Sequence, residues 1–212
     1  MTQRARGPYA KSAAVRERII EAAFETFAAR GYQAATMKEI AAAADITAPG
    51  LSHHFRTKEE LLDAVLAFRD RRHVTPSSWV DTDNVARRTI ETLREDSAQP
   101  NIVALHAMLS AEATDSSHPA HDRYRGRYAD FKTHLSTVFA AAQERGDITA
   151  DVDPRVLATL LIAVMDGVQL QWLYDPDDTD IDATLSALFS CIAPGLLVDD
   201  LGRPAQTAPP FA

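Results

Sequence analysis

Hydroxyl, imidazole and ammonium groups recur along residues 36–58 at spacings that suit contacts with phosphates and with base edges. They belong to Thr36, Thr47, Ser52, His53, His54 and Lys58. Each of these groups can donate a hydrogen bond to an anionic oxygen. Helices that begin after Thr36, after Thr47 and at Lys58 would add free backbone N–H groups and the positive end of a helix dipole. The chemistry predicted from this stretch is noncovalent recognition of phosphate.

Patterns typical of catalytic and metal sites are absent from the sequence. It contains no G-x-S-x-G, no phosphate-binding P-loop and no G-x-G-x-x-G. His118 and His121 lie in a proline-interrupted loop, and no Cys or carboxylate completes a set at ligand spacing. We therefore expect no enzymatic activity, no metal and no cofactor.

The elements that must position these groups are two short helices. Residues 36–55 read TMKEIAAAADITAPGLSHHF. Thr36 and Glu39 form a capping box for a helix to about residue 44, and Thr47 caps a second helix to about His54. The pattern predicts a helix-turn-helix whose second helix exposes small and polar residues and fits a major groove.

Further helical patterns fill the rest of the chain. Alanine is abundant, Gly occurs only 8 times, and no alternating strand pattern is found. We expect helices at about 13–30, 58–72, 81–97, 101–114, 119–145, 154–174 and 180–197, with Gly31 ending the first. The fold class predicted is all-α: an N-terminal three-helix helix-turn-helix domain plus a C-terminal helical ligand-binding and dimerisation domain, about nine helices in total.

Charge is distributed unevenly along the chain. The formal net charge is -8, which as an average disfavours nucleic-acid binding. Residues 1–72, however, hold 12 Lys/Arg and 9 Asp/Glu, a net of +3, whereas residues 73–212 carry -11. We predict a disordered basic arm at 1–12, a DNA-binding domain at 13–73, an effector-binding and dimerisation domain at 74–200 and a disordered tail at 201–212.

The single cysteine, Cys191, excludes an intramolecular disulfide and favours a reducing compartment. Its apolar neighbours Leu188, Phe189 and Ile192 predict that it is buried. The N-terminus lacks the apolar core of a signal peptide. The apolar run from Val156 to Met165 is shorter than the roughly 20 residues of a membrane helix. A cytoplasmic protein without a membrane segment is therefore expected.

Residues 13–73 resemble the DNA-binding domain of the TetR family of bacterial transcriptional regulators. The resemblance rests on Phe27, Gly31-Tyr32, Thr36–Ala41, Ile46-Thr47, His54-Phe55 and Lys58–Leu62, which agree with the family pattern in order and spacing. Ser52 stands where the family often has a phosphate-contacting Tyr, and Pro49-Gly50 replaces a single Gly. The segment 166–173 resembles the eighth helix of one subset of these regulators.

The resemblance implies a transcriptional regulator that is a repressor and a homodimer. It would bind a palindromic operator in double-stranded DNA and would be released by a small-molecule effector of unknown identity. Helices at about 154–174 and 180–197 would form the dimer interface. The alternative is a helical small-molecule sensor with a vestigial DNA-binding head, which the departures at Ser52 and Pro49-Gly50 suggest.

Candidate site residues follow from the residue types and from the resemblance. Base contacts are assigned to Ala48, Pro49, Gly50 and His53. Phosphate contacts are assigned to Thr36, Thr47, Ser52, His54, Lys58, Arg16 and, on the arm, Arg4, Arg6 and Lys11. Ligand contacts are assigned to His106, Tyr128, Phe131, Gln169 and Trp172, for which ordinary core packing is the competing interpretation.

Overall fold

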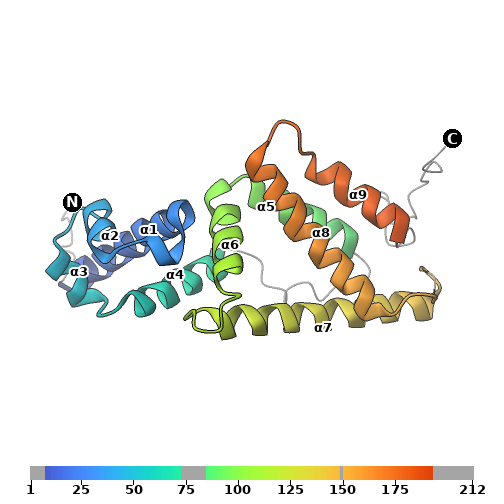
Figure 1. Cartoon of the computed structure of the whole chain (residues 1–212), viewed down its shortest axis with the longest axis horizontal. Helices are drawn as coiled ribbons and strands as arrows, with labels where there is room; N and C mark the ends of the chain where they lie inside the picture. The colour runs from blue at the N-terminus through green and yellow to red at the C-terminus, as the bar shows by residue number, and fades with distance from the viewer. Residues whose placement is uncertain (1–7, 73–84, 149, 193–212) are drawn as a thin grey trace, which may run out of the picture. The chain divides into compact units, whose positions relative to one another are not determined.

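The computed structural model describes residues 8–72, 85–148 and 150–192 of the chain (Figure 1). These ranges contain helices and no strand, so the all-α prediction is confirmed. The helices are α1 (Pro8–Ala34), α2 (Met37–Ala43), α3 (Ala48–His54), α4 (Lys58–Arg72), α5 (Val85–Ser97), α6 (Pro100–Glu112), α7 (His121–Arg145), α8 (Pro154–Tyr174) and α9 (Ile181–Ile192). The residues predicted to form the tail, 201–212, lie outside the described ranges.

The described residues divide into two compact units. The first contains α1 to α4 together with residues 104–122, and the second contains residues 85–103 and 123–192. The sequence predicts one boundary near residue 73. The structure adds a later segment, from within α6 to the start of α7, to the unit that carries the helix-turn-helix.

The first unit is built around a core of large apolar side chains. Ile19, Phe27, Ile40, Leu51, Phe55, Leu61, Leu62 and Leu66 are all almost fully buried. These residues recur at helical spacing on α1, α2, α3 and α4, so each helix buries one face against the others. The short helices α2 and α3, which are too short to be stable alone, are fixed by this shared core.

The start of α1 differs from the prediction. The helix begins at Pro8, so residues 8–12, which were assigned to the disordered arm, are helical. Pro8 occupies the first helical position, where its fixed φ favours the helix and its missing N–H costs nothing. The prediction was wrong here because these residues carry no apolar periodicity. The arm residues Arg4 and Arg6 lie outside the described ranges, as does the side chain of Lys11.

Regular helical geometry in α1 is interrupted at Gly31. Its backbone has φ 75° and ψ 170°, outside the helical region. A positive φ of this size is readily adopted by glycine and rarely by residues with a Cβ. The predicted helix end at Gly31 is therefore correct for the regular part of α1, and a further turn from Tyr32 to Ala34 follows it.

The second unit has its own apolar core. Leu93 of α5, Phe139 of α7, Leu161 of α8 and Phe189 of α9 are buried together in it. An ion pair between Arg94 and Asp182, with an Nε–Oδ2 distance of 2.9 Å, joins α5 to α9 at the surface. This core is a bundle of long helices, as predicted for residues 74–200.

Helix α8 is long and apolar enough, by length and composition, to cross a membrane. Its most apolar stretch has a mean hydropathy of 1.6, and 39% of that stretch is buried inside the protein. A core helix of a soluble protein passes the same test. Its exposed face nevertheless carries large apolar side chains, at Val156, Leu160, Leu170 and Tyr174.

Cys191 is exposed, so the prediction that it is buried was wrong. Its neighbour Phe189 turns into the core, whereas Cys191 lies two residues further along α9 on the opposite face. Apolar neighbours in the sequence did not determine which helix face the cysteine occupies. Residues 193–197, the predicted end of this helix, lie outside the described ranges.

Candidate nucleic-acid interface

Backbone hydrogen bonds fix the turn between α2 and α3. The amide of Asp45 donates to the carbonyl of Ala42 at 3.1 Å, and the amide of Ile46 donates to that of Ala41 at 3.0 Å. Asp45 adopts φ 55°, a left-handed conformation that Asp and Asn tolerate better than most residues with a Cβ. The chain therefore reverses within a few residues, and α3 packs on α2 through Leu51, which is fully buried.

The outward face of α3 presents small and polar side chains. Thr47, Ala48, Pro49, Ser52 and His53 are exposed, and Gly50 and His54 are half-buried. The Thr47 hydroxyl accepts a hydrogen bond from the Gly50 amide at 3.2 Å, so the predicted N-cap is confirmed. Accepting this bond leaves the hydroxyl hydrogen of Thr47 able to donate to an incoming oxygen. The structure thus brings the predicted α3 residues together on one helix.

The N-terminus of α2 is closed by a complete capping box. The Glu39 amide donates to the Thr36 hydroxyl at 3.2 Å, and the Thr36 amide donates to the Glu39 carboxylate at 3.0 Å. The Thr36 hydroxyl also donates to that carboxylate at 2.8 Å. These Thr36 hydrogen bonds, helped by an ion pair with Arg30, lower the pKa of Glu39. Thr36 is exposed, but its hydroxyl hydrogen is already used within the protein.

Lys58 is also engaged inside the first unit. Its ammonium donates to the carbonyls of Tyr32 at 2.8 Å and of Ala35 at 3.0 Å. It also lies 4.3 Å from the centroid of the Tyr32 ring, a cation–π distance. The sequence prediction for Lys58 was a phosphate contact, whereas the geometry gives its ammonium a role in joining the start of α4 to the end of α1.

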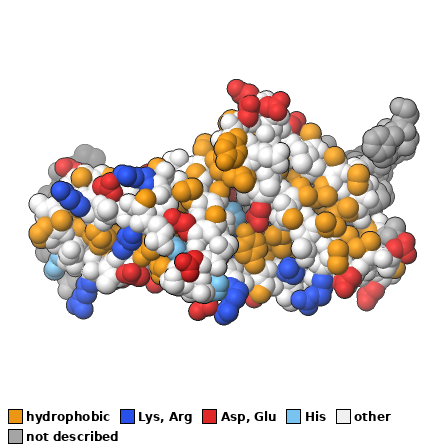
Figure 2. Space-filling model, in the orientation of Figure 1, with side chains coloured by type: hydrophobic (Ala, Val, Ile, Leu, Met, Phe, Trp, Pro, Cys, Tyr) orange, Lys and Arg blue, Asp and Glu red, His pale blue; other side chains and the backbone are white. Residues whose placement is uncertain are grey.

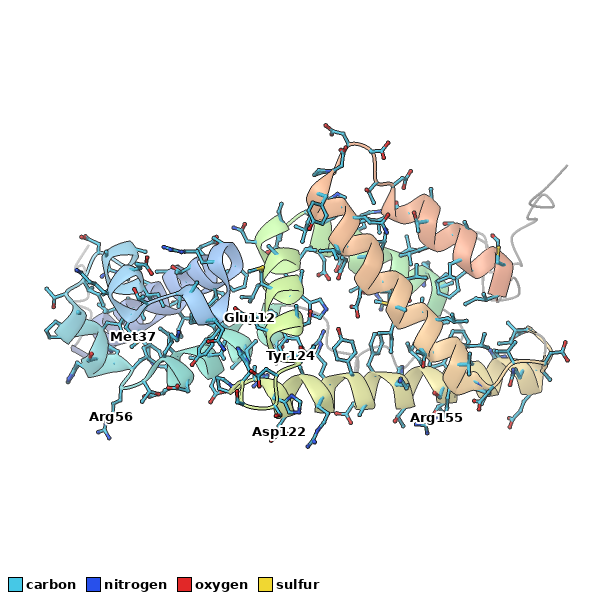
Figure 3. The ribbon with its side chains drawn as sticks, viewed as in Figure 1. Met37, Arg56, Glu112, Asp122, Tyr124 and Arg155 are labelled. Atoms are coloured by element: carbon cyan, nitrogen blue, oxygen red, sulfur yellow. The ribbon has the colours of Figure 1, made fainter. Side chains whose placement is uncertain are left out.

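Arg16, Arg56 and Lys38 are among the exposed cationic side chains of the first unit. Arg16 places its guanidinium carbon 4.5 Å from the centroid of the Phe55 ring, which orients it next to the end of α3. Arg56 follows Phe55 and projects away from the ribbon (Figure 3), and Lys38 lies on α2. Sequence reasoning missed Arg56 and Lys38, although each is a basic residue beside a predicted helix terminus.

The predicted ligand residues fall into different units. Tyr128, Phe131 and Trp172 are partly buried and pack against the core of the second unit, and Gln169 is only 8% exposed. The Tyr128 hydroxyl donates to the Asp166 carboxylate at 2.9 Å, which puts a polar pair between α7 and α8. His106 instead belongs to the first unit and is half-buried there.

Side chains of opposite charge are interspersed over the visible face of the molecule (Figure 2). Within the described ranges, no group of three or more His, Cys, Asp or Glu residues is placed to hold a metal ion. The chemistry available on α3 is therefore hydrogen bonding and van der Waals contact, with cations nearby.

Two protein-family models match this chain. Residues 19–65 match the model described as bacterial regulatory proteins of the tetR family. Residues 89–193 match the model described as the C-terminal domain of BetI-type transcriptional repressors. The first match contains the helix-turn-helix, and the second extends from within α5 to the end of α9.

Whole-chain relatives agree with these matches. The transcriptional regulator TtgR of Pseudomonas putida is 27% identical over 78% of this chain and 83% of its own length. The transcriptional repressor DhaR of a Mycobacterium species is 25% identical over 85% of this chain and 93% of its own. A nicotine-responsive repressor of Paenarthrobacter nicotinovorans is 27% identical over 77% of this chain and 86% of its own.

Solved structures share the fold. NalD, a repressor of a multidrug efflux pump in Pseudomonas aeruginosa, superposes with a TM-score of 0.69 at 23% identity, covering 86% of this chain and 98% of its own. TetR-family regulators typically respond to a ligand and are not enzymes. The matches at both ends of the chain show that it belongs to the TetR family of helix-turn-helix, DNA-binding transcriptional regulators.

Proposed function

We propose that the protein is a homodimeric, cytoplasmic repressor that binds a palindromic operator and leaves it when a small-molecule effector binds. The observation that carries this proposal is the outward face of α3. Thr47, Ala48, Pro49, Ser52 and His53 are exposed together on a helix that Leu51 anchors in the core. A helix with short side chains can approach base edges closely in a major groove.

Base recognition is assigned to Ala48, Pro49, Gly50 and His53. The first three are small and largely apolar, which suits contact with thymine methyl groups. His53 is the longest polar side chain on this face and can donate to or accept from a base edge. We expect the operator half-site to contain conserved A·T pairs opposite α3.

Phosphate contacts are assigned to Arg16, Thr47, Ser52 and His54. Arg56 and Lys38 join them because both side chains are exposed cations, Arg56 two residues after the end of α3 and Lys38 on α2, which packs on α3. Ser52 reaches less far than the Tyr often found at its position, and Arg56 supplies a longer reach from the end of the same helix. Thr36 and Lys58 contribute by holding the ends of α2 and α4, since their side chains already bond within the unit.

Dimerisation is assigned to α8 and α9. The exposed face of α8 carries Val156 (49% exposed), Leu160 (43%), Leu170 (48%) and Tyr174 (85%), an apolar ridge along the whole helix. Covering such a ridge with the same ridge of a second copy removes it from water, and a two-fold pairing uses one surface on both copies. TetR-family regulators act as dimers, which agrees with this assignment.

Effector binding is assigned to the second unit, near Tyr128, Phe131, Gln169 and Trp172. Three of these side chains are aromatic, and Tyr128 holds the Asp166 carboxylate between α7 and α8. Aromatic surface with a few polar groups is the usual lining of a small-molecule site. The effector must favour the state that binds DNA poorly, because only a difference in affinity can shift the equilibrium.

Operator binding is tested by selecting duplexes from a random pool and measuring their affinity by fluorescence anisotropy. We expect one palindromic sequence to be enriched, with affinity falling steeply as salt increases. His53→Ala should relax the base preference at one position of each half-site. The matched variant His134→Ala, on α7 of the second unit, should not change the preference. Enrichment of no sequence would contradict the proposal.

The dimer interface is tested by adding charge to the α8 ridge. Leu160→Glu should convert the dimer to a monomer in light scattering, since the carboxylate would be buried between two copies. Val152→Glu is the control, because Val152 is exposed and apolar but precedes α8. A wild-type protein that is monomeric at micromolar concentration would contradict the dimer.

A further inference from the structure

Glu112, the last residue of α6, bonds with the backbone of α1. Its carboxylate accepts a hydrogen bond from the Tyr32 amide at 2.7 Å and another from the Gln33 amide at 3.2 Å. These two amides begin the turn that follows the break at Gly31. First-turn amides have no partner within their own helix, so a carboxylate is a favourable acceptor for them.

The side chain of Tyr32, the residue whose amide bonds to Glu112, is also held by neighbouring side chains. The His118 ring meets it edge-on, with 4.9 Å between the ring centroids, and Lys58 lies over its face. Burial, followed by the nearby charge of Glu59, raises the pKa of the Tyr32 hydroxyl to about 12. Tyr32 is only 5% exposed, so its ring and its amide are both fixed within the first unit.

The segment that supplies Glu112 and His118 is itself well ordered by local hydrogen bonds. Asp115 accepts from the amide and the hydroxyl of Ser117, both at 2.8 Å. The His118 ring accepts from the Ala120 amide at 3.1 Å, and the His121 ring bonds with the Ala113 carbonyl at 2.9 Å. A segment held in this way presents the Glu112 carboxylate in a defined position.

Resting on the proposed function, we infer that Glu112 is a positioning residue for DNA binding. The amides it holds lie three and four residues before Thr36, which caps α2, so the carboxylate fixes the point where the helix-turn-helix begins. Glu112 lies outside the region that matches the DNA-binding family model, residues 19–65. It links the helix-turn-helix to the part of α6 that belongs to the same unit.

A dimer binds a palindrome tightly only when both heads are held in the right orientation. Loosening the junction at Tyr32 lowers the effective concentration of the second head after the first has bound. A single head on a half-site does not depend on that orientation. The loss of Glu112 should therefore weaken binding to the full operator and spare binding to a half-site.

The experiment compares the full-length dimeric wild type with Glu112→Ala and Glu112→Gln on the selected full operator and on one half-site at low salt. Glu112→Ala should bind the full operator about tenfold more weakly and the half-site about equally. Glu112→Gln keeps one carbonyl acceptor. On a logarithmic scale, its affinity for the full operator should fall by about a third of the loss expected for Glu112→Ala. The control is Glu144→Ala, an exposed glutamate at the end of α7.

Two further readouts separate positioning from simple loss of folding. When operator DNA is titrated at stoichiometric concentration, the fraction of protein that binds DNA should be the same for Glu112→Ala as for the wild type. The dependence of affinity on salt should also keep its wild-type slope, since Glu112 contacts no phosphate. Equal weakening on the full operator and the half-site, together with a smaller active fraction, would overturn the inference.

Gly31 provides a second, independent test. A Cβ on Gly31 would lie 2.4 Å from the Glu112 Oε1 atom, so the alanine variant must displace the carboxylate. It must also strain the backbone, because φ at this position is 75°. Gly31→Ala should weaken full-operator binding in the wild type much more than in the Glu112→Ala background, where only the backbone strain and a 3.2 Å contact with the Met108 methyl group remain.

Additive effects of Gly31→Ala and Glu112→Ala would overturn the inference, because they would show that the two positions act separately. Failure of the proposed function has a different signature. If the proposed function is wrong, the wild-type protein selects no operator. If only the inference about Glu112 is wrong, the wild-type protein binds its operator and the Glu112 variants bind the full operator equally well.

Discussion

The exposed faces of α3 and α8 differ in residue type, and the difference indicates what each face binds. On α3 the outward side chains are short and mostly polar, with Ser52 and His53 among them. On α8 they are large and apolar, with Leu160 and Leu170 in the middle of the ridge. Short polar groups can exchange water for base edges and phosphates, whereas large apolar groups gain only by contact with another apolar surface.

The two units also differ in how polar side chains are used. In the first unit Glu39, Lys58 and Glu112 bond to backbone groups at helix ends, so they fix where the short helices lie. In the second unit the capping carboxylate of Asp180 bonds only to its own helix, at the Ala183 amide, and apolar burial along long helices holds the bundle. Short helices need such polar supports because their own apolar contact area is small.

Truncating one buried leucine in each unit should give the largest effects and separate the two units. Leu51 and Leu161 are both fully buried, and replacing either by alanine should cost about 3 kcal/mol of the free energy of unfolding. Leu51→Ala should abolish operator binding and leave the dimer intact in light scattering. Leu161→Ala should leave half-site binding intact. Denaturant unfolding measures the loss of free energy of unfolding. Loss of the dimer in Leu51→Ala would contradict the claim that the two units can be disturbed separately.

Removing a cation from each unit should produce a smaller effect that depends on salt. Arg56→Ala should weaken binding to all sequences alike and should reduce the salt slope of the affinity by about one. Arg87, exposed on α5, is the matched cation of the second unit. Arg87→Ala should change neither quantity. An unchanged dependence of affinity on salt in Arg56→Ala would show that Arg56 does not contact a phosphate.

Helix caps should matter for DNA binding in one unit only. Thr36 caps α2, and the Asp180 carboxylate accepts from the Ala183 amide at 2.9 Å at the start of α9. Alanine at either position should lower the free energy of unfolding by about 1 kcal/mol. Operator affinity should fall for Thr36→Ala and not for Asp180→Ala. Equal operator affinities of the two variants would contradict the prediction, because they would show that the two caps do not differ in their effect on DNA binding.

The smallest effect concerns pH and His118. Burial lowers the pKa of this histidine, whose Nε2 atom is buried and has no hydrogen-bond partner. Because the folded protein holds the ring neutral, its contribution to stability is complete above the ordinary pKa near 6.5. It is lost as pH falls through the lowered pKa. His118→Asn should flatten this part of the stability profile measured by denaturant unfolding, and an unchanged profile would contradict the assignment.

Local sequence patterns were sufficient to predict the helix-turn-helix. Thr36 with Glu39, Thr47 with Gly50, and the break at Gly31 each act within a few residues, so spacing alone indicates them. The start of α1 at Pro8 was missed because an exposed first turn has no apolar period.

Contacts between distant residues could not be predicted. Nothing near Lys58 in the sequence indicates that its ammonium bonds to the carbonyl of Tyr32, and nothing near Tyr32 indicates Glu112, 80 residues later. The same reason explains Cys191, whose exposure depends on which face of α9 the core covers. His106 was grouped with Tyr128 because both fall within residues 74–200, the range predicted to bind the effector, although they belong to different units.

A hydroxyl-radical footprint on the selected operator, with the protein-to-duplex ratio measured on the same complex, tests the central claim most directly. The account predicts two protomers per duplex and two protected patches whose centres lie about 10 base pairs, or a multiple of that, apart. A single protected patch bound by one protomer would contradict it.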